Sequence, residues 1–220
     1  MPRAALSRQE LETGRVRLCD AALALYEREG EVAVSFRRIA DQTGTSHTRA
    51  YRYFEDKAAL FAAMRVRCYE QFARSTRQAA DAGDSTTARI QALCMGVLDF
   101  VEAYPERFEF MFSPRQPALT QYPALMAIRR ETFDYFVALI QRAVDEDLLE
   151  GDARTLTHVA WAGIYGLFTL HVSGQLVYGR QLRDVYRPMF RRVLYPLFED
   201  FQDHPAATTA GAGPQRRLKP

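Results

Sequence analysis

The chain has 220 residues, of which 48% are hydrophobic, 12% aromatic and 25% charged, and its formal net charge is +2. This length and apolar content suit one large domain or two small ones with hydrophobic cores, and they exclude a disordered or repetitive protein. No uncharged apolar run is long enough to cross a membrane and no apolar export signal is present, so we expect a cytoplasmic protein without a membrane partner.

Charge is unevenly distributed along the chain. Residues 1–80 contain 14 Lys and Arg against 10 Asp and Glu, whereas residues 81–202 contain 12 against 16. A basic N-terminal part followed by a larger acidic part indicates two parts with different roles. The imbalance is too small to identify nucleic acid as the partner by itself.

The cysteines and histidines lack the spacing of disulfides or metal sites. Cys19, Cys68 and Cys94 are odd in number and contain no CxxC pair, so we interpret them as buried and reduced. His158 and His171 have no cysteine or carboxylate beside them at ligand spacing. We therefore expect no metal site and no cofactor.

The N-terminal part has the pattern of short helices joined by tight turns. The segment "VSFRRIADQTG" predicts a short helix capped by Ser35 and ended by Gly44. The segment "TSHTRAYRYF" predicts another, with Ser46 as its cap, and Asp56 then caps a longer helix. Two short helices joined by a turn at Gly44 are the arrangement of a helix-turn-helix.

The rest of the chain predicts longer helices and a polar tail. Helical periodicity without strand alternation predicts an all-α fold, with helices at 86–103, 105–112, 121–147, 153–178 and 182–201. The C-terminal residues are rich in Ala, Thr, Gly and Pro, which predicts disorder. We therefore expect a helix-turn-helix DNA-binding domain at 8–55, a connecting helix at 56–80, a regulatory domain for ligand binding and dimerisation at 81–202, and a disordered tail at 203–220.

The segment "TSHTRAYRYF" separates its apolar and charged residues onto opposite faces of a helix. At about 100° per residue, Ala50 and Phe54 fall together and are expected to face the core. Thr48, Arg49 and Arg52 fall on the opposite side. Arginine can bond the O6 and N7 atoms of guanine with two hydrogen bonds, so Arg49 and Arg52 are the candidates for base readout.

Other polar residues of this segment fall where a recognition helix meets the walls of the DNA groove. Tyr51 and Tyr53 lie on the two flanks, where hydroxyls can reach phosphates, and His47 lies in the first turn, where recognition helices commonly meet bases. The same residues also fit a different function, because exposed arginines are common and a tyrosine-rich face is often a protein interface.

Two helix starts are candidate phosphate sites. Lys57 is a cation in the first turn of a helix, where the helix dipole disfavours positive charge. An external anion bound there would explain why a lysine occupies this position. Ser35 and Arg37, at the start of the preceding short helix, could hold a phosphate in the same way.

The segment "SFRRIADQTGTSHTRAYRYFEDKAALFAAM" resembles the DNA-binding signature of the TetR family of one-component regulators. The likeness is strong over about residues 10–65. Thr45 and Ala50 stand where the family has larger apolar residues, and Thr48 replaces a small one. The matching landmarks are Ile39, Ala40, Gly44, Ser46, Tyr51, Phe54, Lys57 and Leu60. The resemblance implies DNA contacts at Ser35, Arg37, Ser46, His47, Thr48, Arg49, Tyr51, Arg52, Tyr53 and Lys57.

The C-terminal half is similar to one subgroup of this family. The segments "YPERFEFMF" and "WAGIYGLFTLHVSGQL" resemble a C-terminal domain that is marked by a tryptophan followed by a His-Gly pair in the same helix. Here the pair reads Tyr165-Gly166, so the histidine of the subgroup is absent.

The resemblance implies that the second domain binds a small effector, and many aromatic residues could line its pocket. An apolar cavity with a few hydroxyls would suit a flat hydrophobic or aromatic compound. Aromatic residues at helical spacing are nevertheless more often core than ligand site, and His171 is either a polar contact or a buried histidine with an internal partner. The candidate pocket residues are Phe100, Tyr104, Phe108, Met111, Phe112, Phe133, Phe136, Trp161, Tyr165, Phe168 and His171.

The resemblance also implies dimerisation, for which the last two helices are the candidates. Gly163 and Gly166 would allow close helix approach, and Val185, Met189, Val193 and Leu197 form an apolar stripe. A two-fold dimer would place two recognition helices about 34–36 Å apart, or at a multiple of that distance, on a palindromic operator.

Three functions fit these features. The first is a homodimeric DNA-binding regulator, most simply a repressor that a small effector releases from its operator, although the sequence does not separate repression from activation. The second is a helical carrier or enzyme for an apolar molecule. It lacks support because no nucleophile–base pair, phosphate loop or metal cluster is found, so we expect no enzyme. The third is a DNA-binding protein whose pocket has collapsed.

Overall fold

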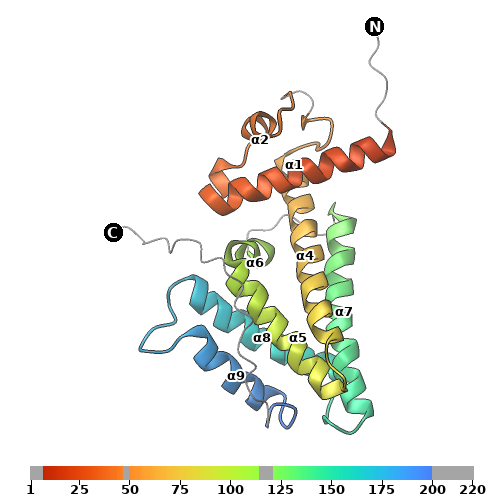
Figure 1. Ribbon diagram of the computed structural model, residues 1–220, viewed down its shortest axis with the longest axis vertical. Coiled ribbons are helices and arrows are strands. Elements are labelled where there is room, and N and C mark those ends of the chain that lie inside the picture. The colour runs from red at the N-terminus through yellow and green to blue at the C-terminus, as the bar shows by residue number, and fades with distance from the viewer. Residues whose placement is uncertain (1–6, 47–49, 114–120, 200–220) are drawn as a thin grey trace.

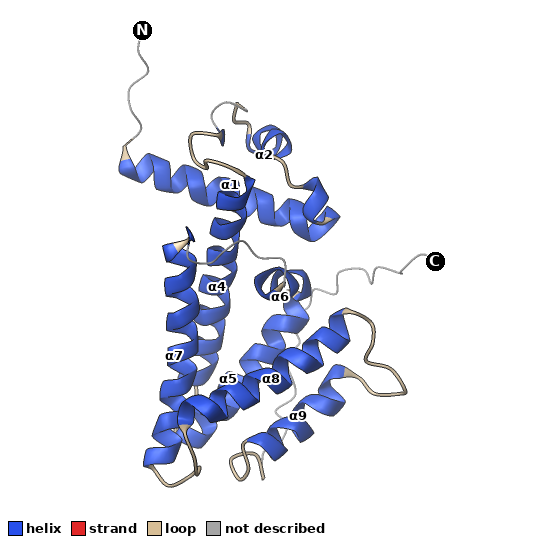
Figure 2. Cartoon of the chain, turned by 180° about the vertical axis from the view of Figure 1, so that it is seen from behind, coloured by secondary structure: helices blue, strands red, loops and turns tan. Residues whose placement is uncertain are grey.

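The computed structural model describes residues 7–46, 50–113 and 121–199, and every regular element in these ranges is helical (Figures 1 and 2). The predicted all-α fold is confirmed. The elements are α1 (Arg8–Glu29), a short 3-10 helix η1 (Glu31–Ala33), α2 (Phe36–Thr43), α4 (Lys57–Asp81), α5 (Thr86–Ala103), α6 (Pro105–Phe112), α7 (Pro123–Asp145), α8 (Ala153–Val172) and α9 (Leu182–Val193).

The predicted caps of the N-terminal helices are present. The Ser35 hydroxyl accepts a hydrogen bond from the backbone N–H of Arg38 at 3.4 Å and begins α2. Gly44 ends α2 in the left-handed conformation, with φ of 64°, which favours glycine. The Asp56 carboxylate accepts from the backbone N–H of Ala59 at 2.7 Å and begins α4.

The helices form an upper unit and a lower body (Figure 1). Helix α1 crosses the upper end of α4 and packs against α2, and these helices make the end of the molecule that carries the predicted helix-turn-helix segment. Helix α4 continues downward between α5 and α7, and α8 packs against α7 and α9. Helix α6 lies where the two parts meet and contacts α1, α4, α5 and α8.

Three helices are shorter than their periodicity predicts, because local backbone chemistry ends them. Helix α7 starts at Pro123, whose ring suits the first helical position. Helix α8 ends at Val172, where the N–H groups of Gln175 and Leu176 both turn back to one carbonyl, that of Leu170. Helix α9 ends at Val193, and the following Pro196 has no N–H with which to continue it.

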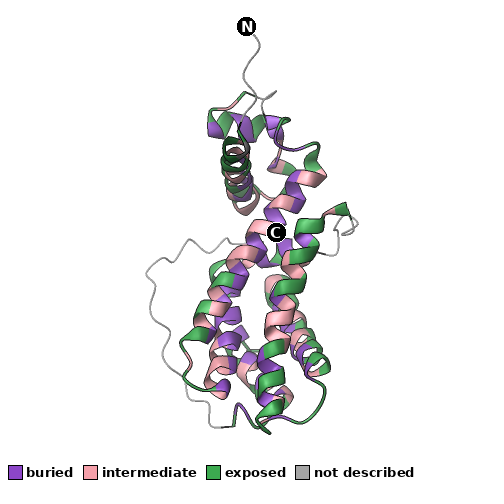
Figure 3. Cartoon of the chain, turned by 90° about the vertical axis from the view of Figure 1, so that its right-hand side faces the viewer, coloured by how far each residue is buried: buried purple, intermediate pink, exposed green. Residues whose placement is uncertain are grey.

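Buried residues run continuously from the upper unit into the lower body (Figure 3). Cys19, Cys68 and Cys94 are buried and free, as predicted, and burial raises the pKa of the Cys19 and Cys68 thiols to about 12. Thiols with such a pKa are unreactive at neutral pH. In the described part of the chain, no helix is both long enough and apolar enough to cross a membrane.

Candidate DNA-binding surface and effector pocket

The predicted recognition segment is anchored to the core as expected. Ala50 is fully buried and Phe54 is 3% exposed, and the backbone N–H of Ala50 donates to the carbonyl of Ser46 at 3.2 Å. Arg15 of α1 stacks its guanidinium on the Phe54 ring, 4.7 Å from the centroid. The predicted residues His47, Thr48 and Arg49 lie outside the described residues.

The predicted exposed position of Tyr53 is wrong. Its ring is buried against α1, where a Cβ atom on Gly14 would collide with it. Residues 51–53 form a turn, in which the N–H of Tyr53 donates to the carbonyl of Ala50 at 3.1 Å. A hydrogen bond between residues three positions apart winds the backbone more tightly than an α-helix, which turns by about 100° per residue. The tighter winding directs the Tyr53 side chain towards α1. The Tyr53 carbonyl accepts from Arg15 at 3.0 Å, which fixes the turn on α1.

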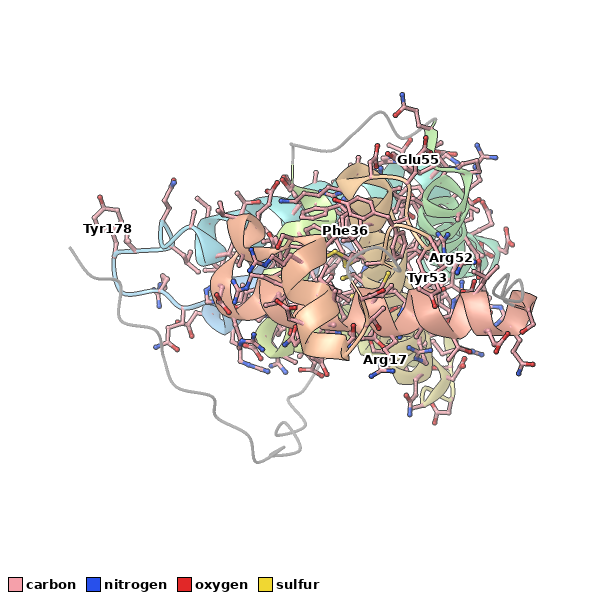
Figure 4. All side chains as sticks on the ribbon, turned by 90° about the horizontal axis from the view of Figure 1, so that it is seen from above. Arg17, Phe36, Arg52, Tyr53, Glu55 and Tyr178 are labelled. Atoms are coloured by element: carbon pink, nitrogen blue, oxygen red, sulfur yellow. The ribbon has the colours of Figure 1, made fainter. Side chains whose placement is uncertain are left out.

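The remaining described candidates are solvent-accessible, and Arg52 is labelled among the side chains in Figure 4. Tyr51 is exposed and rests on the Phe36 ring, with centroids 4.5 Å apart, so the recognition segment lies next to the start of α2. Arg37 and Arg52 are exposed. Within the described ranges neither has a carboxylate partner, whereas Arg38 is held by Glu29 at 2.7 Å. Arg38 therefore joins α2 to α1 through its ion pair with Glu29.

Lys57 has contacts within the chain that the sequence did not reveal. Its ammonium donates to the carbonyl of Glu31 at 3.4 Å and lies 5.1 Å from the centre of the Phe61 ring. These contacts stabilise a cation at the start of α4 without an external anion. Lys57 nevertheless remains exposed.

Basic residues of α1 also position the surface, although no sequence pattern indicated them. Arg17 donates to the carbonyl of Thr43, the last residue of α2, at 2.7 Å. Together with Arg15 and its bond to Tyr53, this contact ties both sides of the turn between α2 and the recognition segment to α1. Figure 4 shows Arg17, Arg52 and Tyr53 around this end of the molecule.

The lower body contains an aromatic pocket of about 400 Å³ between α4, α6, α7 and α8. This volume is within the range for small-molecule sites. Four predicted pocket residues line it: Phe112, Phe133, Phe136 and Trp161. The lining residues not predicted for this site are Tyr69, Phe72, Met126, Arg129, Arg130, Thr132 and His158.

Most of the other predicted pocket residues are structural. Phe100, Phe108, Met111 and Phe168 are buried in the core behind the pocket. Tyr165 is half-buried, and its hydroxyl donates to the Phe112 carbonyl at 3.4 Å, which supports the pocket wall from behind.

Two predicted residues point away from the pocket. Tyr104 is 37% exposed and holds the guanidinium of Arg107 over its ring. His171 is exposed near the end of α8, so it is neither a pocket contact nor a buried histidine. The histidine of the pocket is His158, which lies three residues from Trp161 and therefore on the same face of α8.

The predicted dimer residues divide into two groups. Gly163 serves packing within the chain, because a Cβ atom there would lie 2.7 Å from the sulfur of Met189 on α9. Val185 and Val193 are half-buried, and Leu197 is buried. A Cβ atom on Gly166 would instead meet no neighbouring helix or side chain within 4 Å, so Gly166 lies on the open face of α8.

The open face of α8 is apolar. Val159 is 50% exposed and Leu170 is 42% exposed, and Ala162 and Gly166 lie between them. These four residues recur every three or four positions, so they form one stripe along the helix. Of the predicted dimer residues, Gly166 lies on this stripe.

Family models match both the N-terminal and the C-terminal part of the chain. The model for bacterial regulatory proteins of the tetR family matches residues 18–64. The model for the tetracyclin repressor-like C-terminal domain matches residues 90–195. A sequence search of curated proteins finds no match.

Solved structures share the fold over most of the chain. A protein of unknown function from Rhodococcus sp. RHA1 is 23% identical, with a TM-score of 0.70 over 88% of this chain and 97% of its own. The regulator FadR from Bacillus subtilis, solved with stearoyl-CoA, is 14% identical, with a TM-score of 0.67 over 82% and 97%. The TetR family regulator PfmR from Thermus thermophilus is 14% identical, with a TM-score of 0.61 over 81% and 97%. With its helix-turn-helix end and both family matches, the chain belongs to the TetR family of transcriptional regulators.

Proposed function

We propose that the protein is a homodimeric repressor that binds a palindromic operator and is released when a small apolar or aromatic effector occupies the pocket. The observation that supports this most is that Arg37, Tyr51, Arg52 and Lys57 are all exposed, with the Tyr51 ring against Phe36 at the capped start of α2. Backbone N–H groups and cations gathered at helix starts are suited to phosphates.

The residues of this surface have different proposed roles. Arg49 and Arg52 read bases, together with His47 and Thr48, and Tyr51 and Lys57 contact phosphates, together with Ser35, Arg37 and Ser46. The buried ring of Tyr53 supports the turn instead.

Arg52→Ala and Lys57→Ala should have different effects on DNA binding. Loss of a base contact costs about 1–3 kcal/mol and relaxes preference at one base pair, whereas loss of a phosphate contact weakens all sequences and lowers the salt slope by about one. The measurement is affinity for a duplex selected from a random library, and for a scrambled duplex, over a range of salt concentrations. Equal losses on both duplexes for both variants would contradict these roles.

Dimerisation through the open face of α8 predicts a specific sensitivity at Gly166. Gly166→Arg places a charge where the chain itself has only open space, so the fold should be kept and the dimer lost. Light scattering with size-exclusion chromatography measures the mass, and circular dichroism checks the fold. Ala138→Arg, at an exposed position of α7, is the control that should remain dimeric. A dimeric Gly166→Arg variant would show that this face is not the interface.

Helix α6 connects the pocket with the DNA-binding end. Phe112 forms part of the pocket wall, with its ring 4.9 Å from that of Trp161. Two residues earlier, Phe110 contacts Tyr26 of α1 at 4.6 Å between ring centroids. Arg107 of the same helix forms an ion pair with Glu27 of α1.

An effector that displaces Phe112 would therefore move α6 against α1, and the α1 contacts hold the recognition segment. Release follows if the effector prefers the conformer that fits the operator poorly. The stearoyl-CoA bound in the FadR structure, which has the same fold, is an example of a ligand with an apolar body.

A further inference from the structure

The pocket carries positive charge that its aromatic walls do not require. Arg129 and Arg130 of α7 both line it, and the lining contains no Asp or Glu. Nearby carboxylates already have other partners: Glu131 pairs with Arg77 at 2.8 Å, and Asp134 pairs with Arg154 at 3.0 Å. As far as the structure describes the chain, neither Arg129 nor Arg130 has a carboxylate within ion-pair distance.

Arg129 lies in a partly desolvated position. It is half-buried, and Met126 and Phe133 lie on the same side of α7. Its guanidinium forms a hydrogen bond with the hydroxyl of Tyr69. Burial raises the pKa of Tyr69 to about 12, although the charge of Arg129 and this hydrogen bond both lower it. Tyr69 therefore stays protonated at neutral pH. A guanidinium removed from water without a counter-charge is costly, and a bound anion would offset that cost.

The apolar part of the site lies next to these charges. Phe133 and Phe136 follow the arginines on α7, and Trp161 faces them from α8. The site therefore has a cationic side and an aromatic side within one cavity of about 400 Å³. A purely apolar ligand would fill the aromatic side and leave both guanidinium groups, half-buried Arg129 and exposed Arg130, without a counter-charge.

We infer that the effector is amphipathic, with an anionic group held by Arg129 and Arg130 and an apolar or aromatic body against Phe133, Phe136 and Trp161. This inference rests on the proposed function, in which this pocket holds the effector. The anion is either the carboxylate of a free organic acid or the phosphates of its coenzyme A thioester. The chemistry of recognition is the same in both cases, because arginine binds carboxylate and phosphate oxygens through paired hydrogen bonds.

Two fluorescent probes with the same aromatic scaffold test the inference. Anilinonaphthalene sulfonate carries an anion, and phenylnaphthylamine does not. The chain has one tryptophan, Trp161, and it lies in the pocket wall, so energy transfer from Trp161 to either probe reports binding, and the arginine variants assign that binding to this site. The dissociation constant of each probe is measured on the wild type, on the double variant R129Q/R130Q, and on R129K/R130K.

The sulfonate should bind the R129Q/R130Q variant about tenfold or more weakly, as expected for loss of charged hydrogen bonds, while the uncharged probe changes less than about twofold. R129K/R130K keeps the charge and should recover much of the sulfonate affinity. Arg142→Gln, an exposed change on the same helix, should alter neither probe. Equal weakening of both probes in R129Q/R130Q, or unchanged sulfonate binding, would overturn the inference.

Competition with the sulfonate identifies the source of the anion. Naphthoate, naphthoyl-CoA and methyl naphthoate are added in turn to the wild type. Displacement by naphthoate assigns a carboxylate, and displacement by the thioester alone assigns the phosphates. Displacement by the methyl ester as effectively as by naphthoate, or by neither anion, overturns the inference. Wild-type affinity for the selected duplex is measured separately, so loss of anion preference with intact DNA binding rejects this inference alone, whereas absence of specific DNA binding rejects the proposed function.

Discussion

Phe110→Ala should destabilise the protein by about 3–5 kcal/mol, as expected for truncation of a buried aromatic side chain. Phe110 is 2% exposed, and its ring contacts Tyr26 of α1 and Phe61 of α4, with centroids 4.6 and 5.6 Å apart. It also lies 4.4 Å below the guanidinium of the buried Arg65. The variant would leave a cavity next to a buried charge, at the junction of the two parts of the molecule.

Urea unfolding followed by circular dichroism measures this loss. Met126→Ala is the matched control, because Met126 is 37% exposed and its truncation should cost less than about 1 kcal/mol. A Phe110→Ala variant that loses no more stability than the control would show that this junction is loosely packed, and it would remove α6 as the link between the pocket and α1.

Glu27→Gln should cost about 1–3 kcal/mol and weaken communication between the pocket and the DNA-binding end. The ion pair between Glu27 and Arg107 is largely buried, with side chains 29% and 22% exposed. Burial alone lowers the pKa of Arg107, but the hydrogen bond and charge of Glu27 more than offset this effect, so its pKa lies above the ordinary value. Removal of the carboxylate leaves the guanidinium with the uncharged Gln71 as its remaining hydrogen-bond partner.

A charge-swap double-mutant cycle distinguishes the interaction energy between Glu27 and Arg107 from the contribution of each residue's other contacts. Glu27→Arg and Arg107→Glu are measured singly and together by urea unfolding, and the double variant should recover part of the stability that each single variant loses. Asp134→Asn is the control, since its partner Arg154 is 58% exposed and such surface pairs contribute about 0–1 kcal/mol. Additive losses in the double variant would mean that Glu27 and Arg107 do not stabilise one another.

Features encoded by local chemistry could be predicted from the sequence. The caps at Ser35, Gly44 and Asp56 depend on side chains and backbone angles of neighbouring residues, so these three helix ends were predicted correctly. The buried positions of Ala50 and Phe54 followed from their spacing alone.

Features set by tertiary packing could not be predicted in the same way. Tyr53 turns inward because the chain tightens after Ala50, and Arg15 of a distant helix holds that turn. Gly163 contacts Met189 within the chain because α9 folds back on α8. His158 could have been found, because its three-residue spacing from Trp161 places both on one face of α8.

The central claim is that pocket occupancy and DNA affinity are coupled, and a single thermodynamic cycle tests it most directly. Organic acids that quench Trp161 are first selected as pocket ligands. The affinity of the selected duplex is then measured with and without a saturating acid, and the affinity of that acid is measured with and without the duplex. We expect at least one acid to weaken duplex binding by about fivefold or more, and the duplex to weaken that acid by the same factor, because coupling is reciprocal. If every acid that fills the pocket leaves duplex affinity unchanged, the pocket does not control DNA binding and the claim is wrong.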